Sequence, residues 1–405
     1  MQADIVIIVV GYNRPSSLKR TLDSVSKACY TSYSYIPLYI SLDGCGSDIC
    51  HQYAHEFKWE YGPKKVISHP NRLGLKEHIL ISGDLCSQFD GVIILEDDLC
   101  LSPEFYQYAQ QAFSFFKDDK NIAGIALYNP VFNETACCPF EPIHDGYDNY
   151  FMQIPCSWGQ LWSKKQWIDF RLYSEKYNQS AHYYNLPGNV KLWPDESSWK
   201  KIFYRYLIEK NLFFVYPRIA LSTNFGEKGE HVKEAQPVFQ TPLLLEKYDF
   251  RFSSLSNSKS VYDGFYELDS SLLDKKIHKS ASLTIDLNAT KPLSEIKTDY
   301  LISSKYCARP LVKYSVALYP YELNILLDYT AASDSTVFFS FGKTSDFKDD
   351  PSFYRINQDL NRLFLSIDFL KDAAFNQLKK SKEYQLGSFL LKPIRWIKRL
   401  FLKNR

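Results

Sequence analysis

The chain has 405 residues, of which 45% are hydrophobic and 16% aromatic, and its 48 basic and 46 acidic residues give a net charge of +2. A chain of this length is expected to form two domains, with enough apolar side chains for buried cores. The balanced charge excludes a broad nucleic-acid-binding surface, which would need a strongly basic face.

The cysteines and the N-terminus bear on the cellular compartment. There are nine cysteines and no CxxC pair. Cys137 and Cys138 are adjacent, which suits neither a structural disulfide nor a zinc site. The chain opens on a short strand-like segment instead of a signal peptide, and no apolar run approaches the roughly 18 residues of a membrane helix. We therefore expect a reduced, cytoplasmic setting.

In the first 130 residues, strand signals alternate with helix signals. A continuous apolar run at 5–10 predicts a strand buried on both faces, and the segments 39–42, 91–95 and 122–127 predict further strands. Helices are expected to begin at Pro15, near Leu75 and after Ser102-Pro103. This alternation predicts an α/β fold: a Rossmann-like, mostly parallel sheet with helices on both faces. In such sheets ligands bind at the carboxyl ends of the strands.

The rest of the chain is less regular. Residues 140–192 are expected to be mainly loops, followed by a helix from Trp199 and a strand at 212–215. The serine-rich stretch 251–275 is predicted to be a linker. Short apolar segments at 281–287, 316–318, 324–329, 337–341 and 363–367 predict a small β-sandwich. The expected domains are therefore 1–250, a linker at 251–275, a β-sandwich-like domain at 276–380, and a tail at 381–405.

The tail has a composition of its own. Residues 386–405 contain six Lys or Arg and no acid, with Leu390, Ile394, Ile397 and Phe401 at helical spacing. This pattern favours a basic amphipathic helix that lies on an anionic membrane surface. A basic helix packed on the protein remains the alternative. If the helix lies on a membrane, the protein would be peripheral on the inner face of the cell membrane.

Three consecutive acids, Glu96-Asp97-Asp98, directly follow the predicted strand 91–95. Carboxylates this close repel one another unless a cation or hydrogen-bond donors balance them. Mn²⁺ and Mg²⁺ prefer carboxylate and phosphate oxygens, and a bound ion would neutralise a diphosphate leaving group. An acidic triplet can also be a solvated turn, but its place at the end of a buried strand favours a metal and phosphate site.

The triplet belongs to an ordered series of motifs across about residues 4–232. They are Gly11-Tyr12-Asn13-Arg14-Pro15, Ser41-Leu42-Asp43-Gly44, Asn71-Arg72-Leu73-Gly74-Leu75-Lys76, Glu96-Asp97-Asp98-Leu99, Ser157-Trp158-Gly159-Gln160-Leu161-Trp162, Tyr216-Pro217-Arg218 and Ser222-Thr223-Asn224-Phe225-Gly226. The series resembles bacterial GT-A nucleotide-diphospho-sugar transferases. It is also similar to the alpha-1,3-mannosyl-glycoprotein beta-1,2-N-acetylglucosaminyltransferase family.

The resemblance implies a GT-A fold and a metal-dependent, inverting hexosyl- or N-acetylhexosaminyltransferase of polysaccharide biosynthesis. The donor would be a nucleotide-diphosphate sugar, usually of UDP, and the acceptor a glycan or lipid-linked saccharide. Its implied site residues are Tyr12, Arg14, Asp43, Lys76, Glu96, Asp97 and Trp158 for the nucleotide-sugar, and Asp98 and His231 for Mn²⁺ or Mg²⁺.

Within that set, the resemblance assigns Asp43 to the nucleobase and Arg14 and Lys76 to the diphosphate. Ordinary roles remain open: Asp43 as a turn former before a glycine, the two cations as surface residues, and His231 as a loop residue. Trp162 is expected in the core.

The general base is the weak point of the resemblance. An inverting transferase needs a carboxylate that takes the proton of the acceptor hydroxyl. In similar bacterial proteins an acid follows the tryptophan that opens the helix before the late strand, whereas here Trp199 is followed by Lys200. Asp195 is the preferred substitute and Glu196 the second; either could simply be an acid favoured at a helix N-terminus.

Two other functions compete with sugar transfer. A sugar nucleotidyltransferase can share the architecture, but it needs a glycine-rich loop after the first strand, and Gly11-Tyr12-Asn13-Arg14 does not supply one. The other alternative is a catalytically degenerate carbohydrate-binding protein, which Lys200 in place of an acid would favour.

Overall fold

The computed structural model describes residues 4–176, 185–227, 237–273, 282–331, 338–349, 378–382 and 384–385. The chain divides into two compact units, Met1–Asp349 and Asp350–Arg405. Most of the tail predicted at 381–405, and the predicted strand at 363–367, lie outside the described residues. None of the helices in the described ranges has the length and apolar character of a membrane span. All nine cysteines are free thiols.

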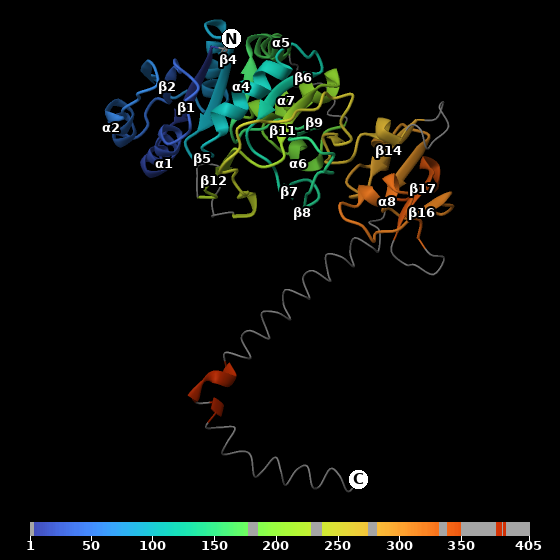
Figure 1. Ribbon diagram of the computed structural model, residues 1–405. Helices are drawn as coiled ribbons and strands as arrows, with labels where there is room; N and C mark the ends of the chain where they lie inside the picture. The colour runs from blue at the N-terminus through green and yellow to red at the C-terminus, as the bar shows by residue number, and fades with distance from the viewer. Residues whose placement is uncertain are drawn as a thin grey trace. The chain divides into compact units, whose positions relative to one another are not determined.

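The first unit is built on a nine-stranded sheet in the order β13-β9-β11-β6-β10-β4-β1-β2-β3 (Figure 1). Its strands are β1 (Ile5–Gly11), β2 (Leu38–Leu42), β3 (Lys64–Ser68), β4 (Gly91–Glu96), β6 (Ile122–Ala126), β9 (Asn149–Met152), β10 (Gln160–Ser163), β11 (Phe213–Pro217) and β13 (Val261–Tyr262). Strands β3, β2, β1 and β4 are parallel, with Ile7 paired to Leu38 and Ile93. The predicted α/β fold class is confirmed.

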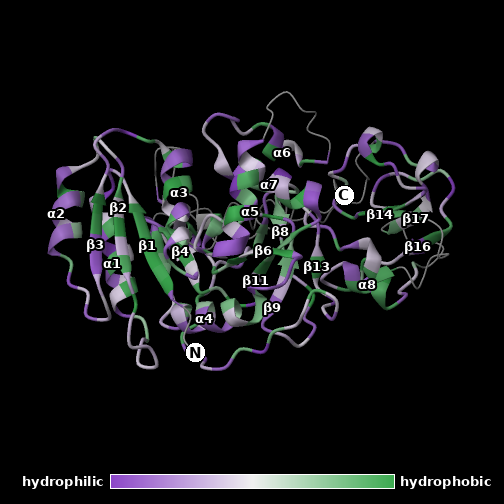
Figure 2. Ribbon diagram, turned by 90° about the horizontal axis from the view of Figure 1, so that it is seen from above, coloured by the Kyte–Doolittle hydropathy of each residue, from purple (hydrophilic) through white to green (hydrophobic). Residues whose placement is uncertain are grey.

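Helices cover both faces of this sheet. They are α1 (Pro15–Ser26), α2 (Asp48–Glu56), α3 (Leu75–Gly83), α4 (Phe105–Phe116), α5 (Lys164–Glu175), α6 (Gly188–Lys191) and α7 (Trp199–Lys210). Figure 2 shows α3, α5 and α7 on one face and α4 on the other. Apolar side chains of α1, α2 and α4 share one buried cluster with β1, β2 and β4.

The region between 140 and 192 is more regular than predicted. Strand β10 runs antiparallel between β4 and β6, and all four of its residues are buried. Because both faces of β10 are covered, its sequence lacks the alternation by which strands are recognised. Helix α5 follows directly, and its capping box of Ser163 and Gln166 is a sequence signal for its start.

The segment predicted as a linker, 251–275, is packed against the main sheet as far as it is described. Val261 pairs with Phe151 of β9, so β13 extends the sheet at its edge. The side chains of Ser253 and Tyr262 are buried. The serine-rich composition therefore marks short turns that hydrogen-bond back to the sheet, for example from Ser253 N–H to Asn149 Oδ1 at 2.8 Å.

Beyond it lies a separate four-stranded sheet in the order β14-β15-β17-β16. Its elements are β14 (Leu283–Asp286), β15 (Tyr300–Ser303), β16 (Val312–Tyr314), β17 (Phe339–Lys343) and helix α8 (Glu322–Leu326). The strand predictions at 281–287 and 337–341 are confirmed in place. The one at 324–329 is wrong, because the Asn324 side chain binds the backbone of Leu318 and Tyr321 and closes a helical turn.

The second layer that a sandwich requires is not seen in 282–331 and 338–349, and residues 350–377 are not described, so the sandwich remains a prediction. The remaining short elements are β5 (Leu99–Leu101) with β12 (Ser222–Asn224), β7 (Phe132–Asn133) with β8 (Cys138–Pro139), and 3-10 turns at Asp84–Ser87, Pro237–Phe239, Ser270–Leu273, Leu293–Glu295 and Thr344–Asp346.

Candidate active site

A pocket of about 210 Å³ opens at the carboxyl ends of β1, β2 and β4. The lining residues are Val10, Gly11, Tyr12, Asn13, Arg14, Asp43, Arg72, Gly74, Leu75, His78, Glu96, Asp97, Asp98, Trp158 and Glu227. Seven of the eleven residues predicted to form the site line this pocket. Six were predicted to bind the nucleotide-sugar, namely Tyr12, Arg14, Asp43, Glu96, Asp97 and Trp158, and the seventh is the predicted metal ligand Asp98. Parallel strands bring these residues together because their carboxyl ends meet at one edge of the sheet.

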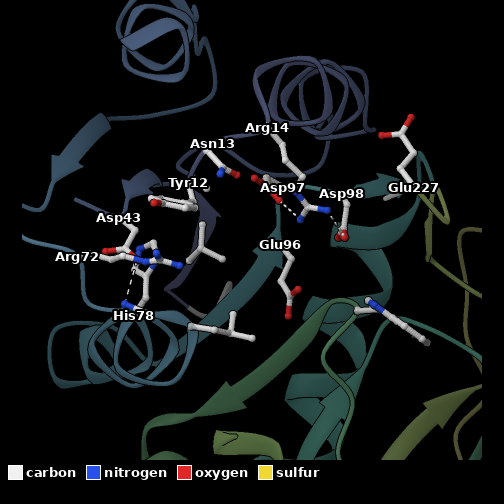
Figure 3. Close-up of a pocket in the computed structure, with 15 residues that line it drawn as sticks. Tyr12, Asn13, Arg14, Asp43, Arg72, His78, Glu96, Asp97, Asp98 and Glu227 are labelled. Carbon is white, nitrogen blue, oxygen red and sulfur yellow. Dashed lines mark hydrogen bonds and ion pairs between the residues drawn. The ribbon is translucent and has the colours of Figure 1, made fainter. Parts of the chain in front are cut away.

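Arg14 lies between two acids of the triplet (Figure 3). Its guanidinium forms ion pairs with Asp97 and, at 2.9 Å, with Asp98 Oδ2. Burial lowers the pKa of Arg14, but the two carboxylates raise it by more, so the side chain stays charged. In this state Arg14 supplies the positive charge that the triplet needs.

The three acids are in different environments. Burial raises the pKa of Asp97 to about 6, against the opposing effect of Arg14. Burial raises the pKa of Glu96 to about 8, Asp98 adds to the shift, and Arg14 opposes it. Figure 3 shows Glu96 pointing away from Arg14. Oδ1 of Asp98 is buried and has no hydrogen-bond partner among the described residues.

Asp43 organises the opposite side of the pocket. Its carboxylate accepts hydrogen bonds from the backbone N–H groups of Gly44 (2.8 Å), Leu73 (2.6 Å) and Gly74 (3.0 Å). A Cβ on Gly44 would lie 2.2 Å from the backbone carbon of Asn71, so only glycine lets this loop pass so closely. Asp43 thus fixes the loop before α3, which is a structural role in addition to the predicted nucleobase contact.

Two pocket residues to which the sequence assigned no role, Arg72 and His78, lie near Asp43 (Figure 3). The guanidinium of Arg72 stacks over the Tyr12 ring, 4.8 Å from its centre. His78 Nε2 lies 2.8 Å from Ser41 Oγ, and burial lowers the pKa of His78 to about 4, so its ring is neutral at physiological pH. Arg72 belongs to a motif noted in the sequence, whereas His78 carries no sequence signal beyond its place in the first turn of a helix.

On the other side, Glu227 also lines the pocket. Its carboxylate accepts a hydrogen bond from Ser17 Oγ at 2.9 Å and pairs with Arg20. Hydrogen bonding to Arg20 is the main cause that lowers the pKa of Glu227. His231 lies outside the described residues, so its metal role stays a prediction.

The two predicted catalytic acids do not line this pocket. Asp195 Oδ1 lies 3.1 Å from the ammonium of Lys201, and its backbone oxygen accepts a hydrogen bond from Lys76 Nζ at 3.1 Å. Lys76 therefore ties the residue to the start of α3, next to the pocket residue Leu75. Glu196 is exposed. Lys76 itself is not among the lining residues.

Trp158 and Trp162 have different roles. Trp158 is partly buried and its ring packs 4.7 Å from Tyr128 and 5.1 Å from Phe239, ring centre to ring centre. Trp162 is fully buried and packs 4.6 Å from Trp167, which confirms the expected core role.

No group of three or more His, Cys, Asp or Glu side chains in the described ranges forms a metal site. A single carboxylate can still hold an ion whose other ligands are phosphate oxygens and water. The unpartnered Oδ1 of Asp98 fits that requirement, since it is a buried acceptor beside the pocket.

The N-terminal part of the chain matches a known family. Residues 6–152 match the family model described as Glycosyl transferase family 2. The chain is also 23% identical over 252 residues to the alpha-1,3-mannosyl-glycoprotein 2-beta-N-acetylglucosaminyltransferase of Arabidopsis thaliana, an alignment that covers 59% of this chain and 51% of that protein. The chain thus spans about half the length of this relative. These matches confirm the resemblance to nucleotide-sugar transferases that the motifs indicated.

Solved structures with a similar arrangement include TarS 1-349 of S. aureus in complex with UDP-GlcNAc, at 13% identity, with 57% of this chain and 61% of that one covered and a TM-score of 0.38. Another is GalNAc-T7 with UDP, GalNAc and Mn²⁺, at 14% identity, 54% and 43% coverage and a TM-score of 0.38.

Proposed function

We propose that this chain, whose residues 6–152 match glycosyl transferase family 2, transfers a sugar from a nucleotide-diphosphate donor to a hydroxyl of a glycan or lipid-linked acceptor. The observation that carries the proposal is the pairing of Arg14 with Asp97 and Asp98 beside an open pocket at the carboxyl ends of β1 and β4. This arrangement holds both a cation for phosphate oxygens and carboxylates for a metal ion or sugar hydroxyls.

The three parts of the donor would occupy different parts of the pocket. The nucleobase, proposed to be uracil, would lie near Asp43 and Tyr12, with the Arg72 guanidinium as a stacking surface. The diphosphate would lie at Arg14, which can exchange its carboxylate partners for phosphate oxygens. The sugar would lie between Glu96 and Trp158, where a carboxylate can bind hydroxyls and an aromatic ring can pack on the sugar.

We assign the metal-ligand role to Asp98, with Mn²⁺ or Mg²⁺ as the ion and His231 as a further candidate ligand. The donor set fits, because the free oxygen of Asp98 is a hard ligand and hard cations bind with one or two carboxylates plus substrate phosphates. When bound, the ion would offset the negative charge that develops on the leaving diphosphate. Arg14 would support the same charge through hydrogen bonds.

Direct attack by the acceptor hydroxyl inverts the anomeric carbon and needs a base. We keep Asp195 as the candidate, because Lys76 holds its backbone next to the pocket and Lys201 orients its carboxylate. Glu196 is the second candidate.

The proposal also includes the cellular location of the protein. A cytoplasmic enzyme whose basic tail lies on the inner face of the cell membrane would meet lipid-linked acceptors at the surface where they are anchored. The alternative function is a carbohydrate-binding protein without turnover, favoured by the lysine at position 200 where similar enzymes place an acid.

The test is release of UDP from UDP-sugars in the presence of acceptor saccharides, measured with Mn²⁺ and with a chelator. The proposal expects acceptor-dependent UDP release that the chelator abolishes, and an Asp98→Ala variant that loses it. Binding of UDP-sugars without turnover over a broad acceptor panel would support the alternative. Full activity of Asp98→Ala would exclude the metal role of Asp98.

A further inference from the structure

Two neighbouring lysines at the start of α7 have opposite environments. Lys201 is 2% exposed, and its ammonium donates to the backbone oxygens of Lys191 (2.9 Å) and Trp193 (2.7 Å) besides pairing with Asp195. Lys200 is half-buried, and its ammonium forms no hydrogen bond or ion pair with the described residues. Lys201 is therefore structural, whereas the charge of Lys200 remains available.

The Lys200 ammonium lies between two tryptophan rings, 5.3 Å from the centre of Trp193 and 5.7 Å from that of Trp158. A cation over aromatic rings is held in place by the negative charge of the ring faces, while its hydrogen-bond donors remain unused. Such a site is stable without a carboxylate and can accept an anionic ligand when one arrives.

Its position relative to the pocket points to the acceptor. Trp158 lines the proposed donor pocket, whereas Lys200 does not. The positive charge of Lys200 nevertheless lowers the pKa of Glu96, which lies at the end of β4. Lys200 thus lies close to Trp158 and Glu96, between which the proposed function places the donor sugar, so an acceptor that receives this sugar would come close to Lys200.

We propose that Lys200 selects an acceptor saccharide that carries a negative charge, as a carboxylate or a phosphate ester, close to the hydroxyl that receives the sugar. This inference rests on the proposed function. The two tryptophan rings would pack against the apolar face of the acceptor sugar, and the ammonium would bind its anionic group. An acid at position 200 would repel the same acceptor.

The test uses three trisaccharide probes that differ only at the terminal residue, which is glucuronic acid, glucose 6-phosphate or glucose. Binding to the full-length protein with UDP and Mn²⁺ is measured by ligand-observed NMR, which needs no turnover. Wild type is expected to bind at least one of the two acidic probes about tenfold more tightly than the neutral one. Comparing the two acidic probes separates carboxylate from phosphate recognition.

A Lys200→Gln variant is expected to lose this preference, and Lys200→Arg to retain most of it. Lys210→Gln removes one exposed positive charge from the same helix and is expected to behave as wild type. UDP affinity is measured in parallel. The inference is overturned if wild type shows no preference, if Lys200→Gln keeps it, or if Lys200→Gln weakens UDP binding instead, which would make Lys200 a phosphate ligand of the donor. Absence of UDP binding to wild type would reject the proposed function separately.

Discussion

At Asp43 a single buried carboxylate accepts three backbone N–H groups and so fixes a wall of the pocket. We predict that Asp43→Ala lowers the free energy of unfolding by roughly 1–3 kcal/mol, because the amides of Leu73 and Gly74 lose their acceptor. UDP affinity should fall with it. Thermal unfolding and UDP titration measure both. Asp43→Asn, which keeps one oxygen, should lie between. An unchanged unfolding temperature in Asp43→Ala would contradict the ordering role.

Asp195, the candidate general base, can be tested by a single substitution. If it is the base, Asp195→Asn should reduce transfer by at least about 100-fold, whereas donor affinity should stay within about twofold. The variant should remain folded, since Lys201 keeps its bonds to two backbone oxygens. Steady-state kinetics and donor titration test this, and Glu196→Gln, at the second candidate base, is measured beside it. Normal turnover in Asp195→Asn would remove it from the mechanism.

Among the elements, α8 carries an unusual acid, since Glu322 in its first turn is buried. Burial raises the pKa of Glu322 to about 7 from an ordinary value of 4.5. The folded state therefore holds this proton more tightly than the unfolded state does. The contribution of protonated Glu322 to the free energy of unfolding is complete below pH 4.5 and is lost as the pH rises through 7.

We therefore predict that Glu322→Gln, which is neutral at every pH, gains stability relative to wild type between pH 5 and pH 8. The gain at pH 8 should reach roughly 3 kcal/mol, the value of the pKa difference. Chemical denaturation at the two pH values measures it. If the curves of the two proteins stay parallel over this range, Glu322 is not buried as a neutral acid.

Some strands could be predicted from sequence patterns and others could not. Strands β1, β2, β4 and β6 were predictable because each is a short segment made mostly of apolar residues. Strand β10 was not, because its order in the sheet is set by partners more than 30 residues away in the chain. The two-residue strand β13 carries too few side chains for any periodicity, and only its pairing with β9 identifies it.

At the scale of the whole molecule, the site was predictable to the extent that strand ends determine it. Asp43 and the acidic triplet follow strands, so their meeting at one edge follows from the parallel sheet. The contacts of Arg72, His78 and Lys200 depend on how loops and helices pack over that edge. No local pattern shows that Lys200 faces two tryptophans while Lys201 turns inward, because both lie in the first turn of one helix.

The tail gives a prediction for the intact chain. Deleting residues 386–405 should abolish binding to vesicles that contain anionic lipid, because it removes six cations and the apolar residues spaced between them. UDP binding should be unchanged. Co-sedimentation with anionic and with neutral vesicles measures the first, and UDP titration the second. Equal sedimentation of the full-length and truncated proteins would show that the tail is not the membrane contact.

The proposed function requires the pocket beside the acidic triplet to bind a nucleotide diphosphate through a metal ion at Asp98. The most direct measurement is calorimetric titration of UDP into wild type and Asp98→Asn, each with and without Mn²⁺. We expect Mn²⁺ to strengthen UDP binding to wild type by at least about tenfold and to have no such effect on Asp98→Asn. Equal enhancement by Mn²⁺ in the two proteins, or no binding of UDP to wild type, would contradict it.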